Sequence, residues 1–209
     1  MRRRGVFLSL EGGEGVGKTT QIALLRDRLQ HCGVDVCITR EPGGTALAEQ
    51  IRPLLVCAQQ ESWCRESEML LFMAARVQHV QRVILPALER GQWVLCDRFH
   101  DSSRVYQTYA HQMPMDSYDA LHRMMLGGFI PDLTLVLDAP VDIGLARAYE
   151  RHNHEMRFEA LDRSFHQAVR DGFLACAQRE PHRMKVVDAT CVSELVHQQL
   201  WEHVIPWLP

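Results

Sequence analysis

The segment VFLSLEGGEGVGKTT, residues 6–20, contains the pattern that decides the fold. The apolar run from Val6 to Leu10 predicts a short strand, glycines follow at once, and apolar residues recur at helical spacing from Lys18 to Gln30. The glycines fit the pattern G-x-x-x-x-G-K-[ST], in which loop N–H groups surround a phosphate at the N-terminus of a helix. A glycine-rich turn that arose by chance is the alternative.

All eight residues of this loop are candidates for binding ATP: Gly12, Gly13, Glu14, Gly15, Val16, Gly17, Lys18 and Thr19. We expect Lys18 to reach the β- and γ-phosphates and Thr19 to ligate Mg²⁺. Glu14 is a poor neighbour for a triphosphate, so it is either an acceptor for a hydroxyl of a second substrate or an acid that faces solvent. No basic side chain lies between Gly13 and Val16, so we expect a cation for the transition state to come from elsewhere.

The rest of the chain predicts one α/β domain. Short apolar runs predict further strands at 34–39, 93–96, 133–137 and 185–187. Helical spacing predicts helices at 18–30, 45–55, 66–90 with a bend near Pro86, 102–109, 115–126, 142–151, 158–179 and 193–207. Apolar strands that alternate with helices form parallel sheets covered on both faces, so we expect about five parallel strands. No repeat or linker divides residues 1–209.

Composition excludes several classes of protein. The net charge of −3 and the pI near 6.4 give no global reason to bind nucleic acid or an anionic membrane. No segment reaches the roughly 18 apolar residues of a membrane span, and the run at 6–10 is too short for a signal peptide. The seven cysteines form no CxxC pair, which argues against a disulfide framework or zinc site. We therefore expect a cytoplasmic protein.

Charged residues follow the predicted strands, where ligands of parallel sheets bind. Arg40 and then Arg52 follow the second strand, and Asp97 and Arg98 follow the third. Arginine suits bidentate phosphate binding, and an aspartate at this edge suits Mg²⁺ or its waters. Each of these residues alone could equally belong to a surface ion pair.

Phe72 and Arg76 lie four residues apart on one predicted helix and therefore share a face. An aromatic ring beside a guanidinium could hold a nucleobase by stacking and by donation to a carbonyl. Spacing alone favours a plainer interpretation, in which Phe72 is a core residue and Arg76 a solvated charge.

Together these blocks resemble thymidylate kinase of the bacterial type. The resemblance rests on residues 11–20, 39–45 with Arg52, FMAARVQH at 72–79, Asp97-Arg98 with Ser102, Ser103, Tyr106 and Gln107, 128–138, and RFE at 157–159. It implies a P-loop nucleoside-monophosphate-kinase-like fold with a five-stranded parallel sheet. It also implies Mg²⁺-dependent transfer of phosphate from ATP to dTMP, in dTTP biosynthesis, by a homodimer.

The resemblance further implies a role for each matching residue in a dTMP site. At the base, Phe72 would stack on thymine and Arg76 would donate to its O4. Ser103 and Gln107 would serve the remaining polar edge of the base.

At the sugar, the resemblance implies that Glu14 takes the 3′-hydroxyl and that Tyr106 crowds out a 2′-hydroxyl. Arg40, Arg52 and Arg98 would hold the dTMP phosphate, with Asp97 near the metal.

Members of the family without an arginine in the phosphate loop place it in a lid, and Arg147, Arg151 and Arg157 flank a polar stretch here. We expect a short lid at about 147–158, with Arg147 at ATP and Arg151 as the transition-state cation. The expected catalytic set is Lys18, Asp97, Arg98 and Arg151.

The sequence departs from the family pattern at two positions and carries two histidines in the expected lid. Met156 stands where the family often has Asp before Arg157, and Thr108 stands where glycine is common. His152 and His154 are expected to be solvated loop residues, since their i, i+2 spacing does not place them on one helix face.

Two other functions compete with this interpretation. A deoxynucleoside kinase would need a carboxylate base for a neutral 5′-hydroxyl and would gain nothing from three arginines at its acceptor. A nucleotide-binding switch would leave the Phe72 and Arg76 pair without a role. Release of ADP that depends on dTMP separates all three.

Overall fold

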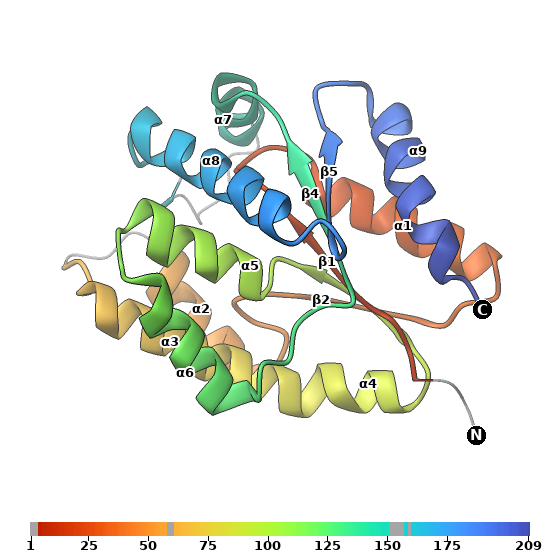
Figure 1. Cartoon of the computed structure of the whole chain (residues 1–209), viewed down its shortest axis with the longest axis horizontal. Coiled ribbons are helices and arrows are strands. Elements are labelled where there is room, and N and C mark those ends of the chain that lie inside the picture. The colour runs from red at the N-terminus through yellow and green to blue at the C-terminus, as the bar shows by residue number, and fades with distance from the viewer. Residues whose placement is uncertain (1–3, 58–60, 151–156, 159) are drawn as a thin grey trace.

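The chain folds around a five-stranded parallel sheet with strand order β2-β3-β1-β4-β5. The computed structural model in Figure 1 describes residues 4–57, 61–150, 157–158 and 160–209. Its strands are β1 Phe7–Glu11, β2 Val36–Arg40, β3 Trp93–Asp97, β4 Leu133–Asp138 and β5 Met184–Asp188. The predicted sheet is therefore confirmed.

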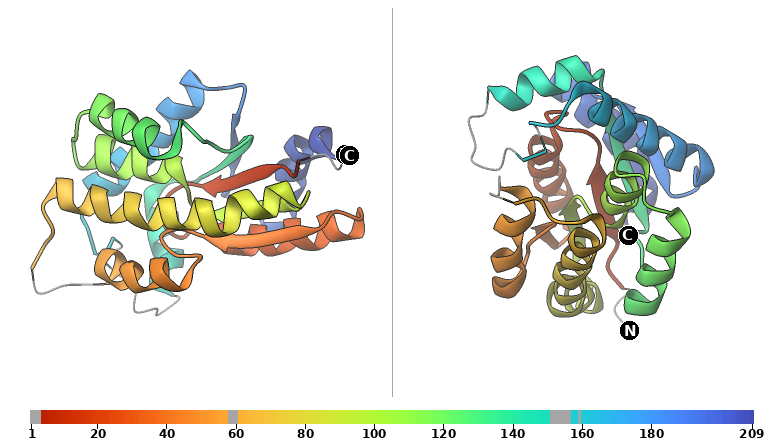
Figure 2. Two further views of the ribbon diagram at one scale, coloured as in Figure 1. Left: turned by 90° about the horizontal axis from the view of Figure 1, so that it is seen from below. Right: turned by 90° about the vertical axis from the view of Figure 1, so that its left-hand side faces the viewer.

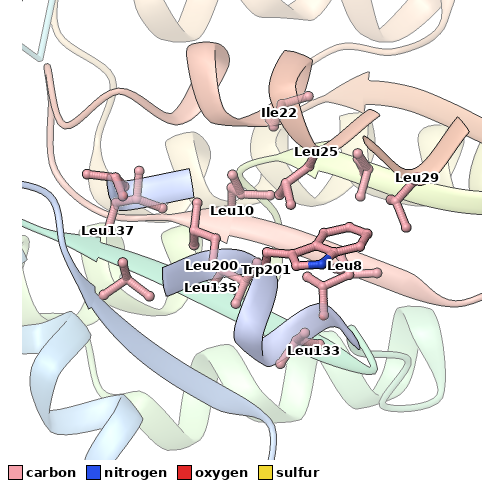
Figure 3. Close-up of a cluster of buried hydrophobic side chains, with 14 of the residues drawn as sticks. Leu8, Leu10, Ile22, Leu25, Leu29, Leu133, Leu135, Leu137, Leu200 and Trp201 are labelled. Atoms are coloured by element: carbon pink, nitrogen blue, oxygen red, sulfur yellow. The ribbon is translucent and has the colours of Figure 1, made fainter. Parts of the chain in front are cut away.

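Buried apolar side chains on both faces hold the sheet between helices, as expected for parallel strands. On one face Leu8 and Leu10 of β1 pack against α1 and α9, in the cluster drawn in Figure 3. On the other face Phe7 packs against the helical segment from Val80 to Leu88. Since strand side chains alternate, Ser9 and Glu11 share the face of Phe7.

The helices lie on both sides of the sheet, with α1 and α9 on one side and α3, α4 and α8 on the other (Figure 1). Their bounds are α1 Lys18–His31, α2 Ala46–Val56, α3 Arg65–His79, α4 Leu85–Glu89, α5 His100–Ser103, α6 Met115–Leu126, α7 Val141–Tyr149, α8 Arg163–Arg179 and α9 Ser193–Val204. A short 3-10 turn, Ile205–Trp207, follows α9. No helix in the described part of the chain is both long and apolar enough to cross a membrane.

Two π-helical segments were not predicted. The first, Val80–Ile84, joins α3 to α4, so that residues 65–89 form one continuous rod in Figure 2. It ends two residues before Pro86, which has no N–H and whose ring crowds the preceding turn. The second, Arg104–Ala110, continues α5 and contains Thr108, whose hydroxyl donates to the Arg104 carbonyl.

The predicted helix at 158–179 was wrong at its start. Helix α8 begins at Arg163, because the Asp162 side chain accepts the Phe165 N–H at 2.8 Å and so caps its N-terminus. Phe158 is instead a buried residue of the preceding turn.

Candidate functional site

The phosphate loop lies between β1 and α1, as predicted. Gly12, Gly15 and Gly17 have φ values of 128°, 70° and 96°, which side chains other than glycine rarely adopt. The Lys18 ammonium donates to the Gly13 carbonyl at 2.7 Å and the Gly12 carbonyl at 3.3 Å. Burial and the nearby Arg98 lower the pKa of Lys18 to about 8.

Two oxygen ligands suited to Mg²⁺ meet beside this loop. The Thr19 hydroxyl, in the first turn of α1, donates to Asp97 Oδ2 at 2.9 Å, at the end of β3. Hard cations prefer such oxygens, and Mg²⁺ keeps several waters and phosphate oxygens among its ligands. The pair fits Mg²⁺ on that ground. Among the residues described, no group of three or more His, Cys, Asp or Glu could hold a metal on its own.

A cavity of about 330 Å³ opens beyond the carboxyl ends of the strands. All nine residues expected to bind dTMP line it: Glu14, Arg40, Arg52, Phe72, Arg76, Arg98, Ser103, Tyr106 and Gln107. Lys18, Thr19 and Asp97 line it too, so the expected phosphate and metal residues share the same space. The structure therefore brings together groups that are up to 93 positions apart in sequence.

Arg76 lines the cavity, and its side chain is only 2% exposed. Its Nε donates to Glu41 Oε2 at 2.6 Å, its Nη1 to the Tyr118 hydroxyl at 3.2 Å, and its Nη2 to the Phe99 carbonyl and to Ser103 Oγ at 3.2 and 2.8 Å. The interpretation of Arg76 as a solvated charge is therefore wrong. Within the described part of the chain, these contacts leave one Nη1 hydrogen for a ligand.

Beside Arg76, Gln107 presents an acceptor without a partner. Its Nε2 donates to Glu68 Oε1 at 3.1 Å, whereas its Oε1 is buried and accepts no hydrogen bond among the described residues. Phe72 is half-buried: it packs on the cluster around Phe173 and also lines the cavity. Both roles considered for Phe72 are therefore compatible with its position.

Glu14 also lines the cavity and binds two other lining residues. Its Oε1 accepts from Arg98 Nη2 and from the Tyr106 hydroxyl, both at 2.7 Å, and the Arg98 guanidinium lies 5.1 Å from the centre of the Tyr106 ring. Burial opposes ionisation of Glu14, but Arg98 and Lys18 outweigh it and hold the pKa at about 2. Glu14 is thus an ionised, partnered carboxylate and not an acid facing solvent.

Two further arginines line the cavity, Arg40 at the end of β2 and Arg52 on α2. Arg40 forms an ion pair with Glu49 at 3.0 Å and its side chain is about half exposed. Arg52 donates to the Pro42 carbonyl at 2.6 Å. Arg40 is exposed, whereas Arg52 is half-buried.

The arginines around the expected lid differ in position. Arg147 donates to the carbonyls of Ala189 and Thr190 at 2.9 and 3.4 Å, and it does not line the cavity. Arg157 donates to the Leu55 carbonyl at 2.6 Å and to Glu68. Arg151 lies outside the described residues, as do Met156, His152 and His154.

Sequence reasoning missed the carboxylates that hold the site together. Glu41, only 5% exposed, binds both Arg76 and His79, and Glu68 binds Gln107 and Arg157. A third carboxylate, Glu11, is fully buried. The one signal for Glu11 was an acidic residue at the end of a continuously apolar strand.

Comparison with known proteins shows which family the chain resembles. The family profile described as Thymidylate kinase matches residues 10–200. A thymidylate kinase of Bradyrhizobium sp. (strain ORS 278) is 48% identical over 203 residues, covering 96% of this chain and 90% of that protein. One of Caulobacter vibrioides is 47% identical over 205 residues, covering 94% and 98%. The crystal structure of the Ehrlichia chaffeensis thymidylate kinase superposes with a TM-score of 0.77 at 34% identity, covering 96% of this chain and 99% of that one. This chain belongs to the thymidylate kinase family.

Proposed function

We propose that the cavity binds dTMP and the phosphate loop binds ATP, so that the γ-phosphate passes directly between them. The family makes the protein a dTMP kinase, which phosphorylates dTMP to dTDP. The observation that carries the assignment of the site is that all nine expected dTMP residues line one cavity together with Lys18, Thr19 and Asp97.

The base would be recognised by one donor and one acceptor. The remaining Nη1 hydrogen of Arg76 would donate to O4 of thymine, and Gln107 Oε1 would accept the N3–H. A bound base would thereby satisfy the buried Gln107 oxygen, which is costly to leave unpaired. The half-buried ring of Phe72 would supply the stacking surface.

The sugar and the phosphate would bind around Glu14. The Glu14 carboxylate would accept from the 3′-hydroxyl, and the ring of Tyr106, which lines the same cavity, would exclude a 2′-hydroxyl. Arg98, with Arg40 and Arg52, which line the same cavity, would hold the dTMP phosphate.

The chemistry needs positioning and charge, and it needs no strong base. With a second pKa of about 6, a phosphate monoester is mostly dianionic at neutral pH, so the nucleophile is ready. Lys18 and Arg98 would hold the two phosphates in line against their repulsion. Mg²⁺, held by Thr19 and Asp97, would neutralise charge on the β- and γ-phosphates.

We further propose a lid at about 147–158 that closes over ATP, with Arg147 at the nucleotide and Arg151 as the additional cation. The proposal rests on the lack of a basic side chain between Gly13 and Val16. A single P-loop domain and a cytoplasmic location, without nucleic-acid or membrane binding, are part of the same proposal.

We propose that the active protein is a homodimer. Helix α2 packs against α3, and α3 packs against α6. Each of these helices exposes one large apolar side chain: Leu47 on α2 is 57% exposed, Leu70 on α3 is 54% exposed and Met124 on α6 is 71% exposed. Exposed apolar surface of this kind supports a subunit interface. Sedimentation at micromolar concentration should give twice the chain mass, and a monomer at all concentrations would contradict the proposal.

One assay tests the function as a whole. ADP release from ATP is measured with dTMP, with thymidine and without any acceptor. Among these three conditions, we expect rapid release of ADP only when dTMP is present. Release with thymidine would indicate a nucleoside kinase, and equal release without acceptor would indicate a nucleotide switch; either result would overturn the proposal.

A further inference from the structure

Glu11 is a buried carboxylate that the proposed chemistry does not use. It ends β1, is 0% exposed and does not line the cavity. Its Oε1 accepts the Phe99 N–H at 2.8 Å and its Oε2 accepts the Ser102 hydroxyl at 2.5 Å, and no cation in the described chain forms an ion pair with it. Burial, with a smaller contribution from Asp101, raises its pKa to about 7. Such a group is costly to bury, so its position needs an explanation.

The first hydrogen bond of Glu11 fixes the backbone next to Arg98. Arg98 has a φ of 65°, a left-handed conformation that is strained for a residue other than glycine. Its own N–H donates to the Leu10 carbonyl at 3.0 Å, and Glu11 holds the N–H of the next residue, Phe99. Two consecutive residues of β1 thus secure the two consecutive amides of the turn.

The second hydrogen bond acts on the Arg98 side chain. Ser102 Oγ donates its single hydrogen to Glu11, which leaves its lone pairs free to accept. Arg98 Nη1 donates to that oxygen at 3.1 Å and to the Gly12 carbonyl at 2.9 Å. Glu11 therefore determines which way the Ser102 hydroxyl points, and with it one of the contacts that orient the guanidinium.

We propose that Glu11 is a positioning residue for Arg98, acting on its backbone through Phe99 and on its guanidinium through Ser102. This inference rests on the proposed function, in which Arg98 binds the dTMP phosphate. The neighbouring Ser103 accepts instead from Arg76. The two adjacent serines of α5 thus contact different arginines, and this supplies a matched control.

The test is a kinetic comparison of Glu11→Gln, Ser102→Ala and Ser103→Ala, with the two double variants that contain Glu11→Gln. Glu11→Gln keeps the size of the side chain but offers one acceptor where two are needed. At pH 8, where Glu11 is ionised, we expect it to lower kcat by about tenfold while the KM for ATP changes less than about threefold. Adding Ser102→Ala to Glu11→Gln should lower kcat little further. Adding Ser103→Ala to Glu11→Gln should lower kcat by the product of the two separate factors.

Several results would overturn this proposal. One such result is a Glu11→Gln protein with wild-type kcat. Another is a Glu11→Gln/Ser102→Ala double variant whose loss in kcat is the full product of the two single losses, since Glu11 would then not act through Ser102. If a thermal melt shows that Glu11→Gln is not folded, the test uses the two serine variants instead. Ser102→Ala must then lower kcat with an unchanged preference for dTMP over dCMP, and Ser103→Ala must alter that preference.

An Arg98→Ala variant separates this proposal from the proposed function. Wild-type kcat in Arg98→Ala would remove Arg98 from phosphate binding, and the proposed function would fail at that residue. A large loss in Arg98→Ala together with no loss in Glu11→Gln would leave the function intact and refute only the positioning role.

Discussion

Replacing dTMP by dCMP as the acceptor should lower kcat/KM much more than replacing it by dUMP. Thymine offers a carbonyl at C4 and an N–H at N3, whereas cytosine offers an amino group and a bare ring nitrogen. Arg76 can only donate and Gln107 Oε1 can only accept, so cytosine would set donor against donor and acceptor against acceptor. Uracil keeps both hydrogen bonds and lacks only the 5-methyl group.

The size of the effect follows from the burial of both side chains. Arg76 is 2% exposed and Gln107 is 1% exposed, so water cannot replace either lost hydrogen bond. Each buried group left unsatisfied costs ~1–3 kcal/mol, and two mismatches should therefore lower kcat/KM by roughly 30-fold to 10⁴-fold. Loss of one buried methyl group costs ~0.8 kcal/mol, which lowers kcat/KM for dUMP by roughly fourfold.

The assay is ADP release with each of the three nucleotides, followed by the same series on two variants. Gln107→Leu removes the acceptor and should reduce the preference for dTMP over dCMP. Gln167→Leu is the matched control, since Gln167 contacts Asp171 on α8 and does not line the cavity, and it should leave the preference unchanged. Comparable turnover of dCMP and dTMP by the wild type would refute the assignment of Arg76 and Gln107.

Three other outcomes are expected. Ribothymidine monophosphate should be a poor acceptor if the Tyr106 ring excludes the 2′-hydroxyl as proposed, and equal kcat/KM for both sugars would contradict that role. Arg151→Ala should lower kcat by ~10³-fold with dTMP binding, measured by calorimetry, within a few-fold; lost binding would make Arg151 a substrate clamp instead. Folding raises the pKa of Glu11 from 4.5 to about 7, so the folded state binds the proton more tightly and this group's contribution to stability falls as pH rises from 5 to 8. Between pH 5 and pH 8 the unfolding free energy of the wild type should therefore fall by about 2–3 kcal/mol relative to that of Glu11→Gln. Urea denaturation at both pH values measures this difference, and an equal difference at pH 5 and pH 8 would contradict the prediction.

The parts of the fold that sequence predicted depend on local patterns. The phosphate loop needs glycines at fixed offsets between a strand and a helix, and both Lys18 and Thr19 follow from that spacing. The strands were found because each is a short apolar run, as at Leu133–Asp138. The arginines after β2 and β3 could be placed at the cavity because the carboxyl ends of parallel strands share one edge.

The missing parts depend on contacts between distant residues. Glu41 meets Arg76 across 35 positions and Glu11 meets Ser102 across 91, and no spacing rule relates residues so far apart. The interpretation of Arg76 as solvated was wrong because a helix position does not reveal that a neighbouring segment supplies a carboxylate. The start of α8 was misplaced because apolar Phe158 continued the helical pattern past the Asp162 cap.

The contact between Glu14 and Arg98 has a consequence for which anions the site accepts. An arginine that already pairs with a carboxylate at 2.7 Å binds sulfate or orthophosphate weakly, because the negative charge of Glu14 offsets the positive charge of the guanidinium and repels a second anion. A deoxynucleotide brings a phosphate for Arg98 and a sugar hydroxyl for Glu14 in one molecule, so it can exchange both partners at once. The carboxylate thus acts as an internal competitor that simple anions do not overcome, and inhibition of the kinase by sulfate should be correspondingly weak.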